Sequence, residues 1–230
     1  MHFLGPDPTR FPAIDETDED GIIAVGGDLT PERLVQAYRR GIFPWYSEGL
    51  PILWHCPDPR FVLEAAALHV PKSLRKMMKR GVYEIRLDTD FEGVIDGCAR
   101  TRRPGQRGTW ITRDMRKAYL KLHALGYAHT AEAWLDGQLV GGLYGVSLGQ
   151  VFYGESMFAI ADDASKVAFA TLVEWMRGWG VSLVDCQQET AHLARFGAAP
   201  WPRARFTAAV ETLTKAPTRQ GKWSLKEGAS

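Results

Sequence analysis

Long apolar runs are missing from the sequence. The best run, Val167 to Val173, is far shorter than the roughly 18 uninterrupted apolar residues that a membrane-spanning helix needs. The start of the chain has prolines at positions 6, 8 and 12, where a secretory signal would need a basic region followed by an apolar one. The sequence therefore predicts neither a membrane protein nor an exported one.

Cysteine is scarce. Cys56, Cys98 and Cys186 are odd in number, far apart in the sequence and in no CxxC arrangement. Such spacing is typical neither of a disulfide-stabilised protein nor of a zinc site. The sequence predicts no bound metal, and its cysteine usage fits a reducing cytoplasm.

An excess of charge of one sign is also lacking. The 28 Lys and Arg residues nearly balance the 27 Asp and Glu residues, for a net charge of +1. Contact with nucleic acid would therefore need a local basic patch. One short stretch does concentrate basic residues: Lys72, Arg75, Lys76, Lys79 and Arg80. A second contains Arg100, Arg102, Arg103 and Arg107. On charge alone, a solvated surface is the simplest interpretation of both.

The chain of 230 residues is long enough to bury one large core with a small companion domain. Its first sixty residues are rich in Pro, Gly and Trp and contain one clear helix, with Thr30 as its cap, Pro31 in its first turn and Gly41 at its end. Residues 57–59 form a Pro-Asp-Pro hinge. We expect a small N-terminal α/β domain at 1–60, a second domain at 61–215 and a frayed polar tail at 216–230.

The order of elements after the hinge indicates an α+β fold. The patterns predict a strand at 83–87, helices that begin after Asp90 and Thr112, strands at 130–135, 139–147 and 151–153, a long helix that starts at Asp162 or Asp163, a strand at 181–184 and two further helices. This is the order of the GNAT acyltransferase fold, whose mixed sheet splays between its fourth and fifth strands. We therefore expect a GNAT-like domain preceded by the small N-terminal domain.

The segment at 156–163 argues against acetyl-CoA as the donor. GNAT acetyltransferases bind the coenzyme pyrophosphate with a Gly-rich basic loop and the following helix N-terminus. Here that loop has no glycine, and Asp162 and Asp163 occupy the place of the pyrophosphate. A GNAT acetyltransferase that uses acetyl-CoA is kept as the alternative enzyme.

Polar residues lie at two strand ends where apolar residues would be expected. Glu155 follows one strand, and Asp185 and Gln187 end another, two positions apart and so on one face. If the sheet splays there, the three side chains converge at its open end. The competing interpretation is that they are hydrogen-bonded structural residues. A thiol triad of Cys186 with His192 and Asp185 is disfavoured, because no activating environment for a thiolate is evident.

Several blocks of the sequence, in one order, closely resemble the bacterial leucyl/phenylalanyl-tRNA-protein transferases. They run from about Gly21 to Phe206. The blocks are Gly26–Leu29, Tyr38–Tyr46, Pro51–Trp54, Pro57–Arg60, Gly108–Thr112, Gly141–Gly145, Gly154–Phe158, Ala164–Lys166 and Asp185–Gln187. The chain is on this basis identified as a member of that family.

The resemblance implies a cytoplasmic, monomeric enzyme that needs no cofactor or metal. Members of the family move Leu or Phe, and less readily Met, from aminoacyl-tRNA to the N-terminal Arg or Lys of a protein, which marks that protein for degradation. They combine a small N-terminal domain with a GNAT-like one. A non-catalytic tRNA-binding module is the remaining alternative, and it would bind tRNA whether charged or not.

The resemblance also implies roles for individual residues. Gln187 accepts a hydrogen of the attacking amine, Asp185 holds Gln187 through a hydrogen bond, and Glu155 binds an amino group. Trp45 and Trp110 lie around the terminal adenosine, and the Lys72–Arg80 run contacts the tRNA backbone. The apolar pocket for the donor side chain comprises Leu143, Phe152, Phe169, Leu172, Met176 and Val184. Because Leu143, Leu172 and Met176 stand where the family has Met and Phe, the ranking of Leu, Phe and Met stays open.

Such a reaction makes modest chemical demands. An aminoacyl ester is already activated, so the enzyme mainly aligns a neutral amine with the carbonyl carbon and stabilises the oxyanion that develops. An α-amino group has a pKa of about 7.7 to 8.0, so a useful fraction is unprotonated near neutral pH. A weak acceptor such as an amide oxygen is then sufficient to guide the remaining hydrogen.

Overall fold

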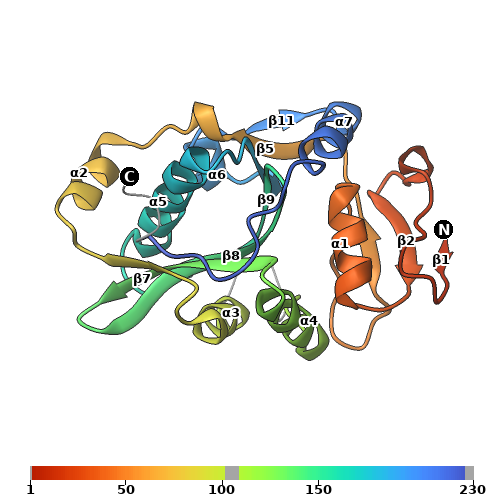
Figure 1. Ribbon diagram of the computed structural model, residues 1–230, viewed down its shortest axis with the longest axis horizontal. Coiled ribbons are helices and arrows are strands. Elements are labelled where there is room, and N and C mark those ends of the chain that lie inside the picture. The colour runs from red at the N-terminus through yellow and green to blue at the C-terminus, as the bar shows by residue number, and fades with distance from the viewer. Residues whose placement is uncertain (1, 102–108, 226–230) are drawn as a thin grey trace.

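The protein contains two β-sheets with helices packed around them (Figure 1). The computed structural model describes residues 2–101 and 109–225. The predicted basic residues Arg102, Arg103 and Arg107 lie outside these described residues, as does Gly108. Within the described ranges, none of the helices has the length and apolar character that crossing a membrane would take.

The first sheet has four short strands in the order β1-β2-β4-β3. Its strands are β1 (Phe3–Leu4), β2 (Ile22–Gly26), β3 (Phe43–Pro44) and β4 (Leu53–His55), with a short 3-10 turn at Ile14–Glu16 and the helix α1 (Pro31–Arg39). Pro31 occupies the first turn of α1, as predicted. Thr30 precedes the helix, but its hydroxyl donates to Asp28 at 2.6 Å and makes no cap hydrogen bond, so the predicted side-chain cap is wrong.

The second sheet has seven strands in the order β11-β5-β10-β9-β8-β7-β6. Its strands are β5 (Arg60–Glu64), β6 (Glu84–Leu87), β7 (Ala128–Leu135), β8 (Gln138–Leu148), β9 (Val151–Ala159), β10 (Leu183–Gln187) and β11 (Ala199–Trp201). Among the described strands of this sheet, only β9 and β10 pair in parallel, because α5 crosses over between them, and the other neighbours are antiparallel. The predicted meander is therefore confirmed, with turns at Asp136-Gly137 and Gly149.

Helices cover both faces of this sheet, and each face has its own core. The remaining helices are the 3-10 turn Ala65–Ala67, α2 (Lys72–Lys79), α3 (Phe91–Arg100), α4 (Arg113–Ala124), α5 (Ala164–Gly178), α6 (Ala191–Ala194) and α7 (Arg203–Leu213). Leu143 and Phe152 face α5, whereas Tyr144 and Tyr153, their neighbours in sequence, face the side of α3 and α4. This alternation follows from the two-residue period of a strand. Asp90 and Thr112 cap α3 and α4 with their side chains, as predicted.

The ladder between β9 and β10 is short. It pairs Leu183 with Val151 and ends at Asp185 and Tyr153, after which β9 continues to Ala159 paired with β8 but no longer with β10. The two strands therefore part just beyond Asp185. The opening was expected between the fourth and fifth predicted strands, 151–153 and 181–184, and it lies between the corresponding β9 and β10.

Helix α1 of the first sheet contacts the elements of the second sheet. The hydroxyl of Tyr153 on β9 donates to the backbone carbonyl of Tyr38 at 2.7 Å. Gly41 follows α1 with a φ of +74°, and a Cβ placed there would lie 2.6 Å from the ring of Phe206 on α7. Only glycine allows both this backbone conformation and this close approach. The contact fixes α1 against the second sheet and so positions Tyr38.

The segment after α7 is packed, at least as far as Trp223. The Trp223 side chain is 1% exposed, and its ring stacks on that of His129 with the centroids 3.7 Å apart. His129 in turn contacts Asp88 at 2.8 Å, and the Trp223 backbone nitrogen donates to the same carboxylate. The expectation of a frayed tail from residue 216 is thus wrong for residues 216–225, because one large aromatic side chain ties this segment to the core.

Candidate active site

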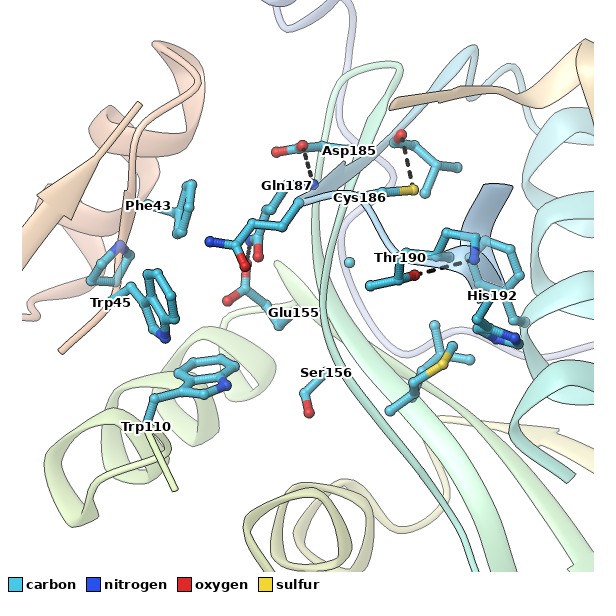
Figure 2. Close-up of a pocket in the computed structure, with 18 residues that line it drawn as sticks. Phe43, Trp45, Trp110, Glu155, Ser156, Asp185, Cys186, Gln187, Thr190 and His192 are labelled. Carbon is cyan, nitrogen blue, oxygen red and sulfur yellow. Dashed lines mark hydrogen bonds between the residues drawn. The ribbon is translucent and has the colours of Figure 1, made fainter. Parts of the chain in front are cut away.

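A cavity of about 390 Å³ lies where β9 and β10 part (Figure 2). The first sheet borders it on one side, and α5 and α6 border it on the other. Its lining residues are Phe43, Pro44, Trp45, Trp110, Leu143, Gly154, Glu155, Ser156, Met157, Phe169, Val184, Asp185, Cys186, Gln187, Gln188, Thr190, His192 and Leu193. The predicted catalytic residues Glu155, Asp185 and Gln187 are therefore brought together.

The cavity takes its lining from both faces of the second sheet. Leu143, Phe169 and Val184 belong to the core on the α5 side, whereas Phe43 and Trp110 pack with the core of the opposite side. A paired sheet would separate these two groups of residues. The cavity exists because the ladder stops at Asp185, which leaves a passage through the layer.

Glu155 lies at a bulge in β9. Tyr144 pairs with Ser156 and Gly145 pairs with Gly154, so Glu155 has no partner of its own on β8. A bulge of this kind redirects a side chain and is common beside active sites. Here the carboxyl group turns toward Tyr38 on α1 and Tyr119 on α4.

Three side chains lie within hydrogen-bond distance of the carboxyl oxygens of Glu155. Tyr38 contacts Oε1 at 2.7 Å, Tyr119 contacts Oε2 at 2.8 Å, and the amide nitrogen of Gln187 donates to Oε1 at 3.0 Å. Burial raises the pKa of Glu155 to about 7, and the nearby charge of Asp185 contributes in the same direction. Burial also raises the pKa of the Tyr38 and Tyr119 hydroxyls well above their usual value, so both remain protonated.

Gln187 reaches the cavity through an unusual backbone conformation. Its φ is +62°, and the pairing of β10 with β5 shifts between Asp185 and Gln187. The regular alternation used to place both side chains on one face is therefore interrupted, although the two residues do lie together. The contact between them is made by the Gln187 backbone nitrogen, which donates to Asp185 Oδ1 at 2.9 Å.

Asp185 is held by an arginine that the sequence reasoning did not select. Arg60 Nε and Nη2 donate to its two carboxylate oxygens at 2.8 and 2.6 Å, and both side chains are fully buried. The guanidinium also lies between the rings of Phe43 and Phe206, 4.7 and 4.6 Å from their centroids. A two-point contact of this type fixes orientation as well as charge.

Three of the six residues predicted for the donor pocket line the cavity: Leu143, Phe169 and Val184. Phe152, Leu172 and Met176 are not among the residues that line it. These three side chains are fully buried in the core between the sheet and α5, behind the residues that face the cavity.

Aromatic residues form the wall on the side of the first sheet. Trp45, Trp110 and Phe43 line the cavity there, and Trp45 and Trp110 are both partly exposed (Figure 2). The carbonyl oxygen of Trp45 lies 3.1 Å from His55 Nε2, which supports this loop. Both tryptophans singled out in the sequence are thus at the site.

Tyr38, Arg60, Tyr119 and His192 were not predicted to be functional. For Tyr38, the hydroxyl group on the buried face of α1 was the overlooked signal. A buried tyrosine hydroxyl needs a hydrogen-bond partner. His192 lines the cavity from α6, and burial lowers its pKa, so its ring is neutral.

The thiol of Cys186 also lines the cavity but is not activated. Burial raises its pKa, and the sulfur lies 3.8 Å from the backbone carbonyl of Val184. A nucleophilic cysteine needs the opposite shift. Across the residues that the structure describes, no group of three or more His, Cys, Asp or Glu side chains is arranged to hold a metal ion.

The basic run forms one exposed surface. Lys72, Arg75, Lys76 and Lys79 lie on α2, Arg80 follows its last turn, and all five side chains are exposed. Arg75 approaches Glu174 on α5 at 3.7 Å. Because both side chains of that pair are largely solvated, it neutralises the patch only weakly.

Solved structures resemble the chain only distantly. The L-PGS of Bacillus licheniformis matches with a TM-score of 0.41 and 12% identity, over 82% of this chain and 58% of that chain. A likeness at this level carries no argument about function or fold.

Comparison with protein families and with curated relatives gives a much closer match. The family described as leucyl/phenylalanyl-tRNA protein transferase matches residues 62–211, and its N-terminal domain matches residues 27–58. A leucyl/phenylalanyl-tRNA–protein transferase of Myxococcus xanthus (strain DK1622) is 62% identical over 97% of this chain and 94% of its own length. One of Nitratidesulfovibrio vulgaris (strain DP4) is 53% identical over 99% and 97%. The chain therefore belongs to the leucyl/phenylalanyl-tRNA protein transferase family.

Proposed function

We propose that this enzyme transfers Leu or Phe, and less readily Met, from aminoacyl-tRNA to the N-terminal Arg or Lys of an acceptor protein. The carrying observation is the passage between β9 and β10, where an amide, two carboxyl groups and an apolar wall meet in one cavity. Family membership supports the donor class and the reaction type. A protein modified in this way would be marked for degradation.

In the reaction, the acceptor nitrogen attacks the ester carbon and forms the peptide bond. The bond between that carbon and the ribose oxygen breaks, and the ribose oxygen takes up the proton that the amine loses. We assign to Gln187 the role of accepting a hydrogen of the amine through its side-chain oxygen. Asp185 supports it by accepting the Gln187 backbone N–H, and Arg60 fixes Asp185. No strong base is required, because the ester is already activated.

The donor side chain is proposed to enter between Leu143, Phe169 and Val184. The surroundings are apolar and of fixed shape, so selection depends on fit. Pockets of this type discriminate by about 1 to 3 kcal/mol per methylene group. Branching at Cβ would bring a methyl group against this wall, which favours Leu and Phe over Ile and Val.

The tRNA is proposed to contact two surfaces. Trp45 and Trp110 are placed to stack on the unpaired bases at the 3′ end, a contact worth about 1 to 3 kcal/mol per base. The exposed basic residues on and after α2 are proposed to contact the phosphate backbone. We propose that the enzyme acts as a monomer in the cytoplasm, with no cofactor.

The domain assignment is also part of the proposal. We propose a boundary near residue 60, a GNAT-like domain at 61–215 and a C-terminal segment at 216–230. The first sheet uses strands up to His55, and the second begins with Arg60. The element order β6-α3-α4-β7-β8-β9-α5-β10 and the parting of β9 from β10 support a GNAT-like arrangement.

Transfer of labelled Leu from Leu-tRNA to a peptide with N-terminal Arg tests this function. The wild-type protein should produce labelled peptide, Gln187→Ala should lose at least about 10²-fold in kcat, and Gln138→Ala, at an exposed strand end, should match wild type. Asp185→Asn, which keeps the size of the buried side chain, should also be impaired while retaining a wild-type circular dichroism spectrum. Full activity of both site variants would remove the proposed mechanism.

The rival functions give different results in simple measurements. An acetyltransferase would be stabilised by acetyl-CoA, so its melting temperature would rise with the coenzyme. Asp163 at the start of α5 carries a negative charge where a pyrophosphate would need donors, and we expect no such rise. A non-catalytic module would bind charged and uncharged tRNA equally and would form no labelled peptide.

A further inference from the structure

Tyr38, Tyr119 and Glu155 bring their side-chain oxygens together in a closed ring. The three residues come from α1, α4 and β9. The Tyr38 hydroxyl lies 2.7 Å from Glu155 Oε1, the Tyr119 hydroxyl lies 2.8 Å from Oε2, and the two hydroxyl oxygens lie 2.5 Å apart. The two tyrosines are fully buried, and Glu155 is 8% exposed. The two contacts to the carboxyl group have ordinary hydrogen-bond lengths, and the contact between the hydroxyl oxygens is at the short end of the range for such bonds.

The ring contains three contacts, but the two tyrosine hydroxyls supply only two hydrogens. Each hydrogen bond needs one hydrogen, and each phenol has one O–H group. If both hydroxyls donate to a carboxylate, the two phenol oxygens face each other at 2.5 Å with lone pairs only. The amide nitrogen of Gln187 donates to Oε1 from outside the ring and supplies nothing to that contact. A third hydrogen must come from the carboxyl group itself.

We infer that Glu155 is a carboxylic acid in the resting enzyme and that the ring of Tyr38, Tyr119 and Glu155 holds three hydrogens and positions Gln187. In this arrangement Oε2 donates to Tyr119, Tyr119 donates to Tyr38, and Tyr38 donates to Oε1. Oε1 is then a carbonyl oxygen that accepts a second hydrogen bond from Gln187. The inference rests on the proposed function only for the role of Gln187.

The surroundings of Glu155 favour the neutral form. Burial is the largest cause of its raised pKa, and the Asp185 carboxylate on β10 adds to it. The guanidinium of Arg60 on β5 lies beside Asp185 and donates hydrogen bonds to Asp185 rather than to Glu155. The aromatic ring of Tyr144 on β8 packs against that of Tyr119, with their centroids 5.4 Å apart. The groups packed around the carboxyl are thus phenols, one amide and one negative charge.

The ring fixes which end of the Gln187 side chain faces the substrate. A primary amide carries its donor nitrogen and its acceptor oxygen in different directions. Because the nitrogen is bonded to Oε1 of Glu155, the oxygen is presented away from the ring. Loss of the third hydrogen would remove the hydrogen bond between the hydroxyls of Tyr38 and Tyr119. The position of Glu155, and with it that of Gln187, would then be less firmly fixed. Glu155, Tyr38 and Tyr119 are therefore positioning residues for Gln187.

A titration followed by nuclear magnetic resonance tests the protonation state directly. Protein labelled with ¹³C at the glutamate side-chain carboxyl is titrated, and the resonance of Glu155 is identified by its loss in Glu155→Gln. We expect a midpoint near the value of about 7, well above the ordinary 4.5. A midpoint near 4.5 would mean a carboxylate throughout the neutral range and would overturn the inference.

Conservative replacement tests the positioning role. Gln at position 155 is uncharged but keeps an acceptor oxygen and a donor nitrogen in the same places. We expect Glu155→Gln to retain kcat within about tenfold of wild type, and Glu155→Ala to lose about 10²-fold or more. Equal losses in both variants would show that a negative charge is required and would contradict the neutral form.

The pH profile of kcat supplies the second readout. The acceptor amine must lose a proton, which gives a rise toward about pH 8 in every variant. In wild type, ionisation of Glu155 should add a decline on the alkaline side, and Glu155→Gln should lack this decline. A decline of equal size in Glu155→Gln would exclude Glu155 as its source.

The two proposals can fail separately. The carboxyl titration uses the resting protein and needs no turnover. If wild type forms no labelled peptide while Glu155 titrates near 7, the proposed function is disproved, but the protonated ring of Tyr38, Tyr119 and Glu155 is supported. If wild type transfers Leu while Glu155 titrates near 4.5, only the ring is disproved.

Discussion

Arg60 donates two parallel hydrogen bonds to Asp185, 2.8 and 2.6 Å long, and neither side chain reaches solvent. The pair joins the first strand of the second sheet to the strand that ends in Gln187. Because Asp185 also accepts the backbone N–H of Gln187, the arginine controls the position of the residue assigned to the amine. One ion pair thus serves both the stability of the sheet and the geometry of the site.

Removal of the arginine should be costly. Arg60→Met leaves the Asp185 carboxylate buried without its cation, and such a loss destabilises proteins by about 3 to 5 kcal/mol. Denaturant unfolding measures the effect. Arg205→Ala is the matched control, since its pair with Glu64 is largely exposed and should contribute at most about 1 kcal/mol. Similar losses in the two variants would contradict this view of the buried pair.

Stability should also report the protonation of Glu155. The folded protein keeps its proton up to a pKa of about 7, whereas the unfolded chain releases it near 4.5. This contribution is therefore complete below pH 4.5, declines by up to about 1.4 kcal/mol per pH unit as pH rises to 7, and is absent above it. The stability difference between wild type and Glu155→Gln, measured from pH 4.5 to 8, should show this decline. A flat difference would count against a raised pKa.

The lining of the cavity, rather than the family positions alone, should determine donor choice. Leu143→Phe narrows the wall and should reduce the kcat/KM for Phe-tRNA relative to Leu-tRNA by about tenfold or more. Met176→Leu changes a fully buried residue behind the wall and should leave that ratio within about twofold. Parallel transfer assays with both charged tRNAs measure it. A larger effect at Met176 than at Leu143 would reverse the assignment.

The basic helix α2 should appear in the salt dependence of tRNA binding. Each lost phosphate contact lowers the slope of log K against log salt by about 0.7 to 0.9. Lys76→Glu with Lys79→Glu should therefore weaken binding and flatten the slope. Lys215→Glu, at another exposed lysine, serves as the control. An unchanged slope in the double variant would indicate an ordinary solvated surface.

Trp223 should stabilise the whole domain. Its ring is buried against His129, and replacement of a buried aromatic residue by Ala costs about 3 to 5 kcal/mol. Thermal unfolding of Trp223→Ala should show that loss. Phe3→Ala, at a side chain that is 80% exposed, should change stability by no more than about 0.5 kcal/mol. Equal stability of Trp223→Ala and wild type would mean that this contact contributes nothing.

Sequence patterns predicted the elements whose signals are local. The caps at Asp90 and Thr112 and the Asp136-Gly137 turn depend on neighbouring residues, and the structure contains all of them. Thr30 is the exception, because Asp28 competes for its hydroxyl. The burial of Trp223 was missed for a different reason: its partners Asp88 and His129 are distant in the sequence.

The site was predictable in its composition but not in its contacts. Glu155, Asp185 and Gln187 were found as polar residues at strand ends, and the resemblance supplied their roles. Two bulges, which no alternation pattern reveals, decide where their side chains point. Arg60 and Tyr38 were missed because their partners, Asp185 and Glu155, are distant from them in the sequence. The sequence could not show that Phe152, Leu172 and Met176 lie behind the cavity lining, because that depth depends on the three-dimensional packing.

The short ladder between β9 and β10 has one more consequence. In a continuous sheet, the backbone N–H and C=O groups beyond Asp185 and Tyr153 would form hydrogen bonds between β9 and β10. The two bulges keep these groups apart. A mutation that removed one bulge and extended the β9–β10 pairing by one residue pair would close the cavity without changing any reactive side chain. The catalytic activity of this enzyme thus depends on the early end of the β-ladder between β9 and β10.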